Sequence, residues 1–223
     1  MKIVKRQMML HHAVSIIGGF MAGYTICNHT DLLANAQTGN LIHLVVSACH
    51  GDLAGIGWCL LLFVIYAAGN VFYVLCRRVS RLSMKIVSLG VTALSVAAVS
   101  VLSLTGLPYL AVAPLAFAMP VQWNAFKIAG GNSSATIFSS NNVRQTFMLL
   151  TNYFLDRKQK DLRNARFYAA TLLCFHLGVA AGCLSGMAFA AQGIWCCLLF
   201  VALAAVAYYR YESAKIRALQ GEA

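Results

Sequence analysis

The chain has 223 residues, of which 60% are hydrophobic and only 10% are charged. Soluble domains carry about 25% charged residues, and the mean hydropathy of +0.72 also excludes an intrinsically disordered chain and a small disulfide scaffold. The composition therefore predicts an all-α protein embedded in a membrane. The net charge of +11 would point to nucleic acid in a soluble protein, so the positions of the basic residues decide its meaning.

Six apolar windows are long enough to cross about 30 Å of hydrocarbon as helices. They are residues 8–27, 56–76, 86–104, 107–128, 167–190 and 191–209. The first window lacks the small-residue cleavage site of a signal peptide, so we interpret it as a retained helix. Residues 38–49 and 143–155 are also apolar but too short, since about 13 helical residues rise only about 20 Å. Each follows a polar, helix-breaking run, residues 34–40 and 139–142, which predicts two re-entrant half-helices.

The positions of the basic residues favour this topology. With a cytoplasmic amino terminus and two re-entrant segments, 16 of the 17 Lys and Arg fall on the inner side, as the positive-inside rule requires. If the two short segments crossed the membrane instead, the cluster from Arg77 to Lys85 would face outward. The basic balance is thus explained by orientation and by anionic lipid headgroups, and no nucleic-acid partner is expected. The inner residues are Lys2, Lys5, Arg6, Arg77, Arg78, Arg81, Lys85, Lys127, Arg157, Lys158, Lys160, Arg163, Arg166, Arg210, Lys215 and Arg217.

The two half-helices look related at an offset of 102 residues, which is the separation of Asn40 and Asn142. Each half of the chain then reads as span, half-helix, span, span. Three crossings per half are an odd number, so residues 107–211 must lie inverted relative to residues 8–104, with residues 212–223 as a cytoplasmic tail. We therefore predict one membrane domain, residues 1–223, with six transmembrane helices and two re-entrant half-helices in two inverted-topology repeats. Transporters and channels share this architecture.

Several motifs of the chain resemble the YoaK family of bacterial membrane proteins, a group with a domain of unknown function. The motifs are Gly18-Gly19-Phe20, Tyr24-Thr25, residues 34–40, residues 122–126, Ala135-Thr136 and Asn142-Val143-Arg144. The resemblance covers nearly the whole chain, and the Asn-Ala-Gln-Thr-Gly-Asn run is its most specific part. It implies a bacterial inner-membrane protein of six or seven spans that is often described as a transporter, without a settled substrate.

The chain departs from that family at two places. Many relatives carry Asp at the position of Ala22, and a second Thr-Gly-Asn where this chain has Ser140-Asn141-Asn142. The first departure removes a proton or cation site. The second leaves open whether both half-helices bind in the same way.

A half-helix that begins inside the membrane leaves its first backbone amides without intrahelical partners. Thr38, Asn40, Ser140 and Asn142 are residue types that cap such amides, and Gly39 permits a positive φ or a close backbone approach. Two roles are open: the polar residues satisfy only the break, or the free amides and the positive helix ends also bind a polar or anionic solute. The candidate site residues at the breaks are Asn35, Gln37, Thr38, Gly39, Asn40, Ser140, Asn141 and Asn142.

Five further polar residues lie within the predicted spans and half-helices. Arg144 is the one basic residue outside the inner segments, and no Asp or Glu falls in a span. It is therefore a candidate for attracting a substrate anion, or it snorkels to the interface. His43 and His176 either relay protons or form interhelical hydrogen bonds. Gln122 and Asn124 form a polar group in the fourth predicted span, beside three prolines that suit a kinked cavity wall or a bent packing helix.

The cysteines and the glycines at positions 178, 182 and 186 are predicted to serve helix packing rather than a binding site. The eight cysteines have no C-x-x-C spacing and lie in or beside apolar segments, so we expect small membrane hydrophobes rather than disulfides or zinc ligands. No metal or cofactor site is expected. Gly178, Gly182 and Gly186 recur every four positions, which indicates close helix packing.

The sequence favours a transporter or channel-like facilitator for a small polar solute, with an anion among the candidates. A channel is preferred to a proton-coupled carrier, because no intramembrane carboxylate is present to carry protons. The alternative is a non-transporting membrane partner or sensor subunit. A membrane-embedded enzyme is not expected, since no H-E-x-x-H, P-loop, carboxylate pair or nucleophile with a base is found. A bundle of this size is compatible with a homodimer.

Overall fold

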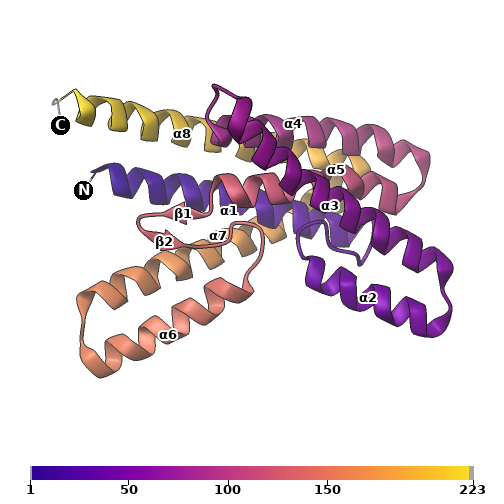
Figure 1. Cartoon of the computed structure of the whole chain (residues 1–223), viewed down its shortest axis with the longest axis horizontal. Helices are drawn as coiled ribbons and strands as arrows, with labels where there is room; N and C mark the ends of the chain where they lie inside the picture. The colour runs from indigo at the N-terminus through magenta and orange to yellow at the C-terminus, as the bar shows by residue number, and fades with distance from the viewer. Residues whose placement is uncertain (1, 221–223) are drawn as a thin grey trace.

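The computed structural model describes residues 2–220 and is almost entirely helical (Figure 1). The elements are α1 (Lys2–Asn28), α2 (Gln37–His50), α3 (Leu53–Val79), α4 (Met84–Leu102), η1 (Ser103–Thr105), α5 (Pro108–Ala125), β1 (Ile128–Ala129), β2 (Asn132–Ser133), α6 (Ser140–Asp156), α7 (Gln159–Phe189), η2 (Ala190–Cys196) and α8 (Cys197–Leu219). The two strands form an antiparallel hairpin that pairs Ile128 with Ser133.

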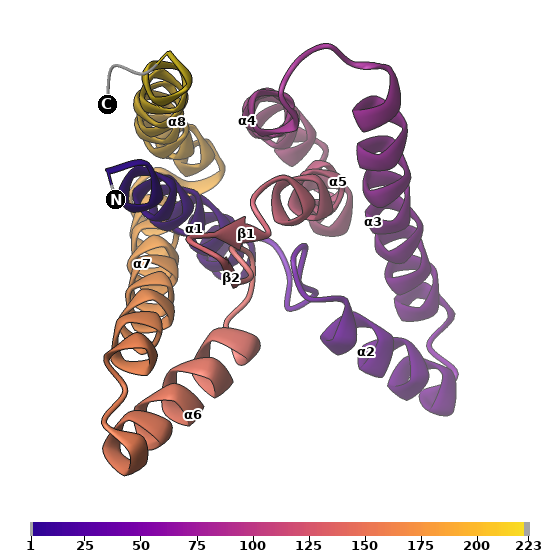
Figure 2. The same cartoon turned by 60° about the vertical axis from the view of Figure 1, so that its left-hand side comes forward.

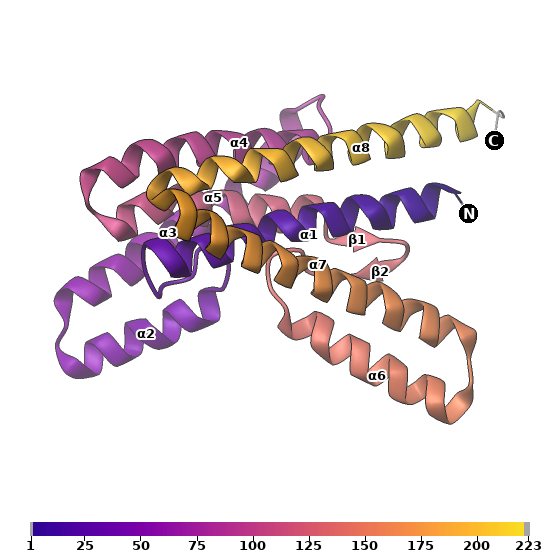
Figure 3. The same cartoon turned by 180° about the vertical axis from the view of Figure 1, so that it is seen from behind.

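Within residues 2–220, four helical stretches are long and apolar enough to cross a membrane by length and composition. They are Lys2–Asn28, Leu53–Val79, Met84–Thr105 and Gln159–Leu219. The last stretch holds α7, η2 and α8, and the chain reverses direction at η2 (Figures 1 and 3). The protein is therefore an all-α membrane protein, as its composition predicts.

The two predicted short segments form short helices. α2 has 14 residues and α6 has 17 residues, so they rise about 21 Å and 25 Å at 1.5 Å per residue. Each begins near the middle of the bundle, and the two run toward opposite ends of it (Figure 1). Both are strongly exposed along their length, because each packs mainly on one neighbour, α3 for α2 and α7 for α6.

Two central helices organise the packing. α1 packs against α7 and α8, whereas α5 packs against α3 and α4. In Figure 2, α1, α6, α7 and α8 lie on one side of the bundle, and α2 to α5 lie on the other. Each central helix therefore packs on helices from the other half of the chain, which interlocks the two halves.

The α1–α7 contact depends on glycine. The backbone of α1 at Ile16 and Phe20 lies so close to Gly178 and Gly182 that a Cβ at either glycine would overlap it, and Gly19 lies equally close to the carbonyl of Phe175. This confirms the predicted close packing by the glycines of α7. Such an approach lets two helices gain dispersion contacts along their backbones, which is how small residues associate helices in lipid.

The predicted fourth span is shorter than expected. Its helix, α5, ends at Ala125, and the last residues of the 107–128 window enter the hairpin instead. Gly130 and Gly131 form the turn with φ values of 59° and 82°, which glycine adopts without a steric penalty. Gln7 of α1 fixes the hairpin, because its side chain accepts from Gly130 N and donates to Ile128 O.

We name the two ends of the bundle by their contents. Both termini, the α3–α4 turn, the hairpin and the α6–α7 turn lie toward one end, which we call the basic end, because the predicted inner Lys and Arg belong to these segments (Figures 1 and 3). The α2–α3 turn, the α4–α5 turn and η2 lie toward the opposite end, which we call the far end.

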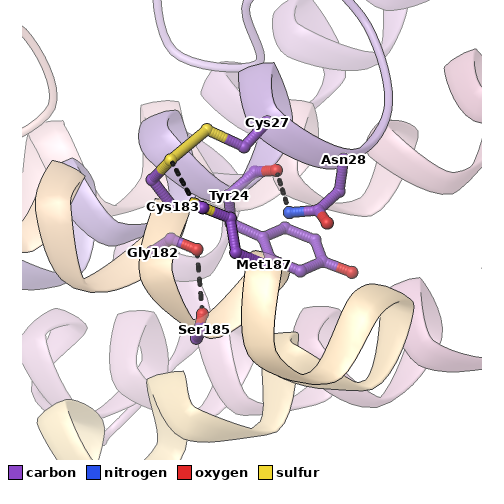
Figure 4. Close-up of a disulfide and its surroundings, with 7 residues drawn as sticks. All are labelled: Tyr24, Cys27, Asn28, Gly182, Cys183, Ser185 and Met187. Carbon is purple, nitrogen blue, oxygen red and sulfur yellow. Dashed lines mark hydrogen bonds between the residues drawn. A yellow bond between two sulfur atoms is a disulfide. The ribbon is translucent and has the colours of Figure 1, made fainter.

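A disulfide joins α1 and α7 near the far end (Figure 4). It links Cys27 to Cys183, whose Cα atoms are 5.5 Å apart, a separation typical of disulfides. The expectation that all eight cysteines are unpaired hydrophobes is therefore wrong for this pair. The sequence carries no short-range spacing for it, since the two residues are 156 positions apart and only the α1–α7 packing brings them together.

Candidate functional site

The candidate site is the place where two non-helical segments meet inside the bundle. We call them the first unwound segment, residues 29–36, and the second unwound segment, residues 134–139. They touch where Asn35 Nδ2 donates to Ile137 O. Asn35 is 5% exposed and Ile137 is fully buried. Irregular backbone at membrane depth requires such cover by protein, because lipid cannot satisfy its polar groups.

One asparagine ties each unwound segment to the helix that follows it. Asn40 Nδ2 donates to Leu33 O at 2.7 Å, and Leu33 N donates back to Asn40 Oδ1 at 2.9 Å. Asn142 Nδ2 donates to Ala135 O at 2.8 Å, seven positions earlier, just as Leu33 lies seven positions before Asn40. The predicted role of Asn40 and Asn142 as helix caps is therefore wrong, because their amides bind the preceding segment.

The first amides of both half-helices lack side-chain caps. The residue before α2 is Ala36 and the residue before α6 is Ser139, and neither side chain caps its helix within the described residues 2–220. Thr38 and Ser140, which we expected to cap, are exposed. α2 thus begins two residues after Asn35 and α6 three residues after Ile137, and the first amides at these positive helix ends are free to bind water or a solute.

Unpartnered polar atoms accompany these helix starts. Both side-chain polar atoms of Gln37, the Oγ of Ser139 and the Oδ1 of Asn35 are buried without a hydrogen-bond partner in the part of the chain that the structure describes. Buried polar groups cost about 1 to 3 kcal/mol each when they stay unpaired. Water or a bound solute is the usual partner of such groups. Gln37 and Ser139 are also equivalent at the offset of 102 residues.

Gln122 and Asn124 serve different neighbours. Gln122 is 1% exposed and donates to Val14 O on α1 at 3.2 Å and to Thr136 Oγ1 in the second unwound segment at 3.3 Å. Asn124 donates to Asn70 Oδ1 on α3 at 2.9 Å. The structure therefore brings Gln122 to the crossing and directs Asn124 to the α3–α5 contact.

A buried polar cluster beside the second unwound segment was not predicted from the sequence. His11 Nδ1 donates to Phe126 O at 3.0 Å, its Nε2 lies 3.1 Å from Ser134 Oγ, and Ser134 Oγ donates to Asn142 Oδ1 at 2.8 Å. Histidine at position 11 is visible in the sequence near the start of the first span. Its partners are not, because the contact depends on how residues 134–139 fold back toward α1.

Three predicted site residues lie on exposed surfaces and are not among the buried residues of the crossing. His43 and Arg144 are exposed on α2 and α6, and His176 is exposed on α7, where its Nδ1 donates to Leu172 O. Arg144 Nη2 donates to Asn141 Oδ1 at 3.3 Å. Gly39 is half-buried, and a Cβ added there would meet no other atom within 4 Å. Gly39 also has no positive φ, so within residues 2–220 the structure shows neither a positive φ nor a close approach of protein atoms at this glycine.

A second hydrogen-bonded group lies near the far end. Tyr24 Oη donates to Ala191 O at 2.6 Å, so His29 Nε2, which lies 3.2 Å from the same Tyr24 oxygen, must be the donor of that bond. Burial lowers the pKa of His29 from its ordinary value of 6.5. Burial therefore favours the neutral form of His29, which links the start of the first unwound segment to α1.

The helices and the buried crossing define an all-α membrane protein with two unwound, polar segments in its interior. Comparison with known families places it further: residues 10–207 match the family described as protein of unknown function DUF1275, and the chain belongs to that family. No curated protein and no solved structure matches the chain.

Proposed function

We propose that the protein is a transporter or channel-like facilitator that moves a small polar solute past the crossing of the two unwound segments. The observation that carries the proposal is the pair of uncapped half-helix starts with their buried, unpartnered Gln37, Ser139 and Asn35 atoms. A merely structural break would satisfy these atoms internally. Polar groups left open at two broken helices are instead the arrangement by which transporters bind their solutes.

The charge of the crossing favours an anionic or acceptor-rich solute. Each helix start carries the equivalent of roughly half a positive charge, and both half-helices begin at the crossing. The six acidic residues all lie outside the predicted spans. Asp31 belongs to the first unwound segment but is exposed, and no Asp or Glu is buried within residues 2–220, so no buried carboxylate compensates that potential or carries protons for coupling. Passive flow is therefore favoured over a proton-coupled carrier. Arg144 lies in the second turn of α6 on its exposed surface, so its positive charge would act on an anion outside the crossing.

Two sets of observations support a six-span, inverted-repeat arrangement behind this pathway. The helix contacts come in matched pairs. The contact of α1 with α7 matches that of α5 with α3, the contact of α2 with α3 matches that of α6 with α7, and the contact of α4 with α5 matches that of α8 with α1. The Asn40–Leu33 and Asn142–Ala135 bonds also match at the offset of 102 residues. In the six-span arrangement α5 crosses the membrane, and α7 and α8 cross separately on either side of η2.

Orientation follows from charge and from cysteine chemistry. The basic end faces the cytoplasm under the positive-inside rule. The Cys27–Cys183 disulfide joins α1 and α7 close to the last residues of both helices, on the side of the far end, which then faces the oxidising side of the membrane, where disulfides persist. With the resemblance to the YoaK family, this supports a bacterial inner-membrane protein with both termini in the cytoplasm.

Solute flux into liposomes that contain the purified protein tests the function. The panel consists of urea, glycerol and small monovalent anions, and we expect flux of at least one of them. Replacing the unpartnered groups in the Gln37→Met/Ser139→Ala variant should lower that flux about tenfold or more, whereas Asn152→Leu, on the exposed surface of α6, should not change it. If the transported solute is an anion, Arg144→Gln should lower its binding while the protein stays folded.

Absence of flux for every solute with folded wild-type protein would overturn the transport proposal and favour a partner or sensor subunit. Flux that is unaffected by Gln37→Met/Ser139→Ala would leave transport standing but would place the pathway away from the crossing.

A further inference from the structure

A second candidate site lies at the basic end, between α1, the β1–β2 hairpin and the start of α7. A cavity of about 760 Å³ opens there, and Lys5, Lys160 and Arg163 contribute to its lining. A neighbouring cavity of about 430 Å³ shares Arg163 with it and adds Arg166. Three cationic side chains from two helices therefore line the larger cavity, which we call the recess, and Arg166 lines the smaller cavity beside it.

These cations have no protein counter-ion among the described residues. The two ion pairs found within residues 2–220 join Lys158 to Asp156 and Lys215 to Glu212. The lining of neither cavity includes Asp156 or Asp161, the two carboxylates near the start of α7. The recess is therefore an uncompensated positive site, and an anion in it would gain from the charges of Lys5, Lys160 and Arg163.

Neutral polar groups add hydrogen-bonding capacity to the same recess. Asn132 of the hairpin and Asn164 of α7 line the larger cavity, and His12 lines both cavities. His12 Nε2 is buried and has no partner in the part of the chain that the structure describes. The hairpin is held in place by the Gln7 bonds and by Tyr168, which donates to Ser133 O at 2.9 Å.

One wall of the recess is apolar. Val4, Met8 and Met9 on α1 line the larger cavity beside its cations. A free phosphate ion would leave this wall without a partner. A molecule with an anionic head and an apolar tail would cover both surfaces, and at the basic end of a membrane protein the phospholipids of the inner leaflet have that chemistry.

We propose that this recess is a binding site for an anionic glycerophospholipid. Its phosphate lies against Lys5, Lys160 and Arg163, with Arg166 beside it, and its acyl chains follow Val4, Met8 and Met9 out of the cavity. The bound lipid bridges α1, the hairpin and α7, so it fixes the hairpin that leads into the second unwound segment. The site is separate from the crossing, and its existence does not depend on transport.

Native mass spectrometry of the full-length protein tests the proposal, after reconstitution in nanodiscs with equimolar phosphatidylglycerol and phosphatidylcholine. We expect wild-type protein to retain phosphatidylglycerol selectively. The Lys160→Gln/Arg163→Gln variant should reduce that retention about tenfold, because two basic contacts near the headgroup are lost. The matched control is Arg77→Gln/Arg78→Gln, which removes the same charge from exposed positions at the end of α3 and should retain the lipid.

A second variant separates a lipid from a phosphate ion. Met8→Trp places a larger side chain in the space beside the apolar wall without changing the charge, so it should displace the lipid. The melting temperature checks that the variant is still folded. Inorganic phosphate in excess should not displace phosphatidylglycerol from wild-type protein. Equal retention by the two charge variants, retention by Met8→Trp, or displacement by phosphate alone would each overturn the assignment to a lipid.

Discussion

Asn35 donates its side-chain hydrogen bond to the carbonyl of Ile137, the residue that lies 102 positions further along the chain. This separation equals the offset that aligns Asn40 with Asn142. A residue that contacts its own equivalent is expected at the axis relating two copies, so this contact supports the proposed repeats. The two unwound segments therefore depend on each other for burial, and neither half of the chain contains the crossing alone.

The asparagine ties should contribute similarly to stability in both halves. Asn40→Ala removes two hydrogen bonds and leaves the N–H and C=O of Leu33 unpaired, and Asn142→Ala removes the bonds to Ala135 and Ser134. We expect each variant to lower the free energy of unfolding by about 2 to 3 kcal/mol. Chemical denaturation in detergent measures this, with the exposed Asn152→Ala as control. Losses no larger than that control would contradict the role given to these bonds.

The sequence predicts those parts of the fold that depend on hydropathy and local breaks. Apolar runs gave the long helices, and the polar runs before residues 38 and 143 located both short helices to within three residues. Glycines at every fourth position identified the face of α7 that meets α1. These features are local, because lipid demands apolar surface and internally bonded backbone at each point of a span.

The sequence does not predict features in which side chains choose among distant partners. An asparagine offers both a donor and an acceptor, so Asn40 and Asn142 could either cap a helix or bind a second backbone segment, and only the folded path of the unwound segments decides. Cys27 and Cys183 meet only through α1–α7 packing. The hairpin did have a local signal, because Gly130-Gly131 lies between the pair Ile128-Ala129 and the pair Asn132-Ser133. The signal was missed because the apolar window 107–128 runs into the first of these pairs.

The glycine contacts should make α7 sensitive to a single methyl group. Gly182→Ala places a Cβ against the backbone of Phe20, so α1 and α7 must separate, and we expect a loss of about 1 to 3 kcal/mol in unfolding free energy. Gly90→Ala, at a helical site of α4 with no neighbour within 4 Å, should be neutral or stabilising by up to about 1 kcal/mol. Comparable melting temperatures for both variants would show that the close approach is not needed for stability.

The disulfide should stabilise the α1–α7 pair from the far end. Without reductant, thiol alkylation followed by mass mapping should modify the exposed Cys49 and leave Cys27 and Cys183 protected. Cys183→Ser should lower the free energy of unfolding by about 2 to 4 kcal/mol, since it removes a long-range cross-link. Cys49→Ser serves as the control and should have little effect. Alkylation of Cys27 in unreduced, folded protein would exclude the pairing.

His29 should make stability fall as the solution becomes acidic. Burial lowers the pKa of His29 in the folded protein below its ordinary value of 6.5. As the pH drops through 6.5, His29 therefore becomes protonated in the unfolded chain while it is still neutral in the folded chain. The free energy of unfolding should then decrease by up to about 1.4 kcal/mol per pH unit until the folded-state pKa is reached. His29→Gln should remove this part of the slope, whereas His50→Gln, exposed at the end of α2, should keep it. Denaturation curves measured at about four pH values between pH 5 and pH 8 give the slope of the unfolding free energy against pH. Equal slopes for wild type and His29→Gln would rule out this contribution.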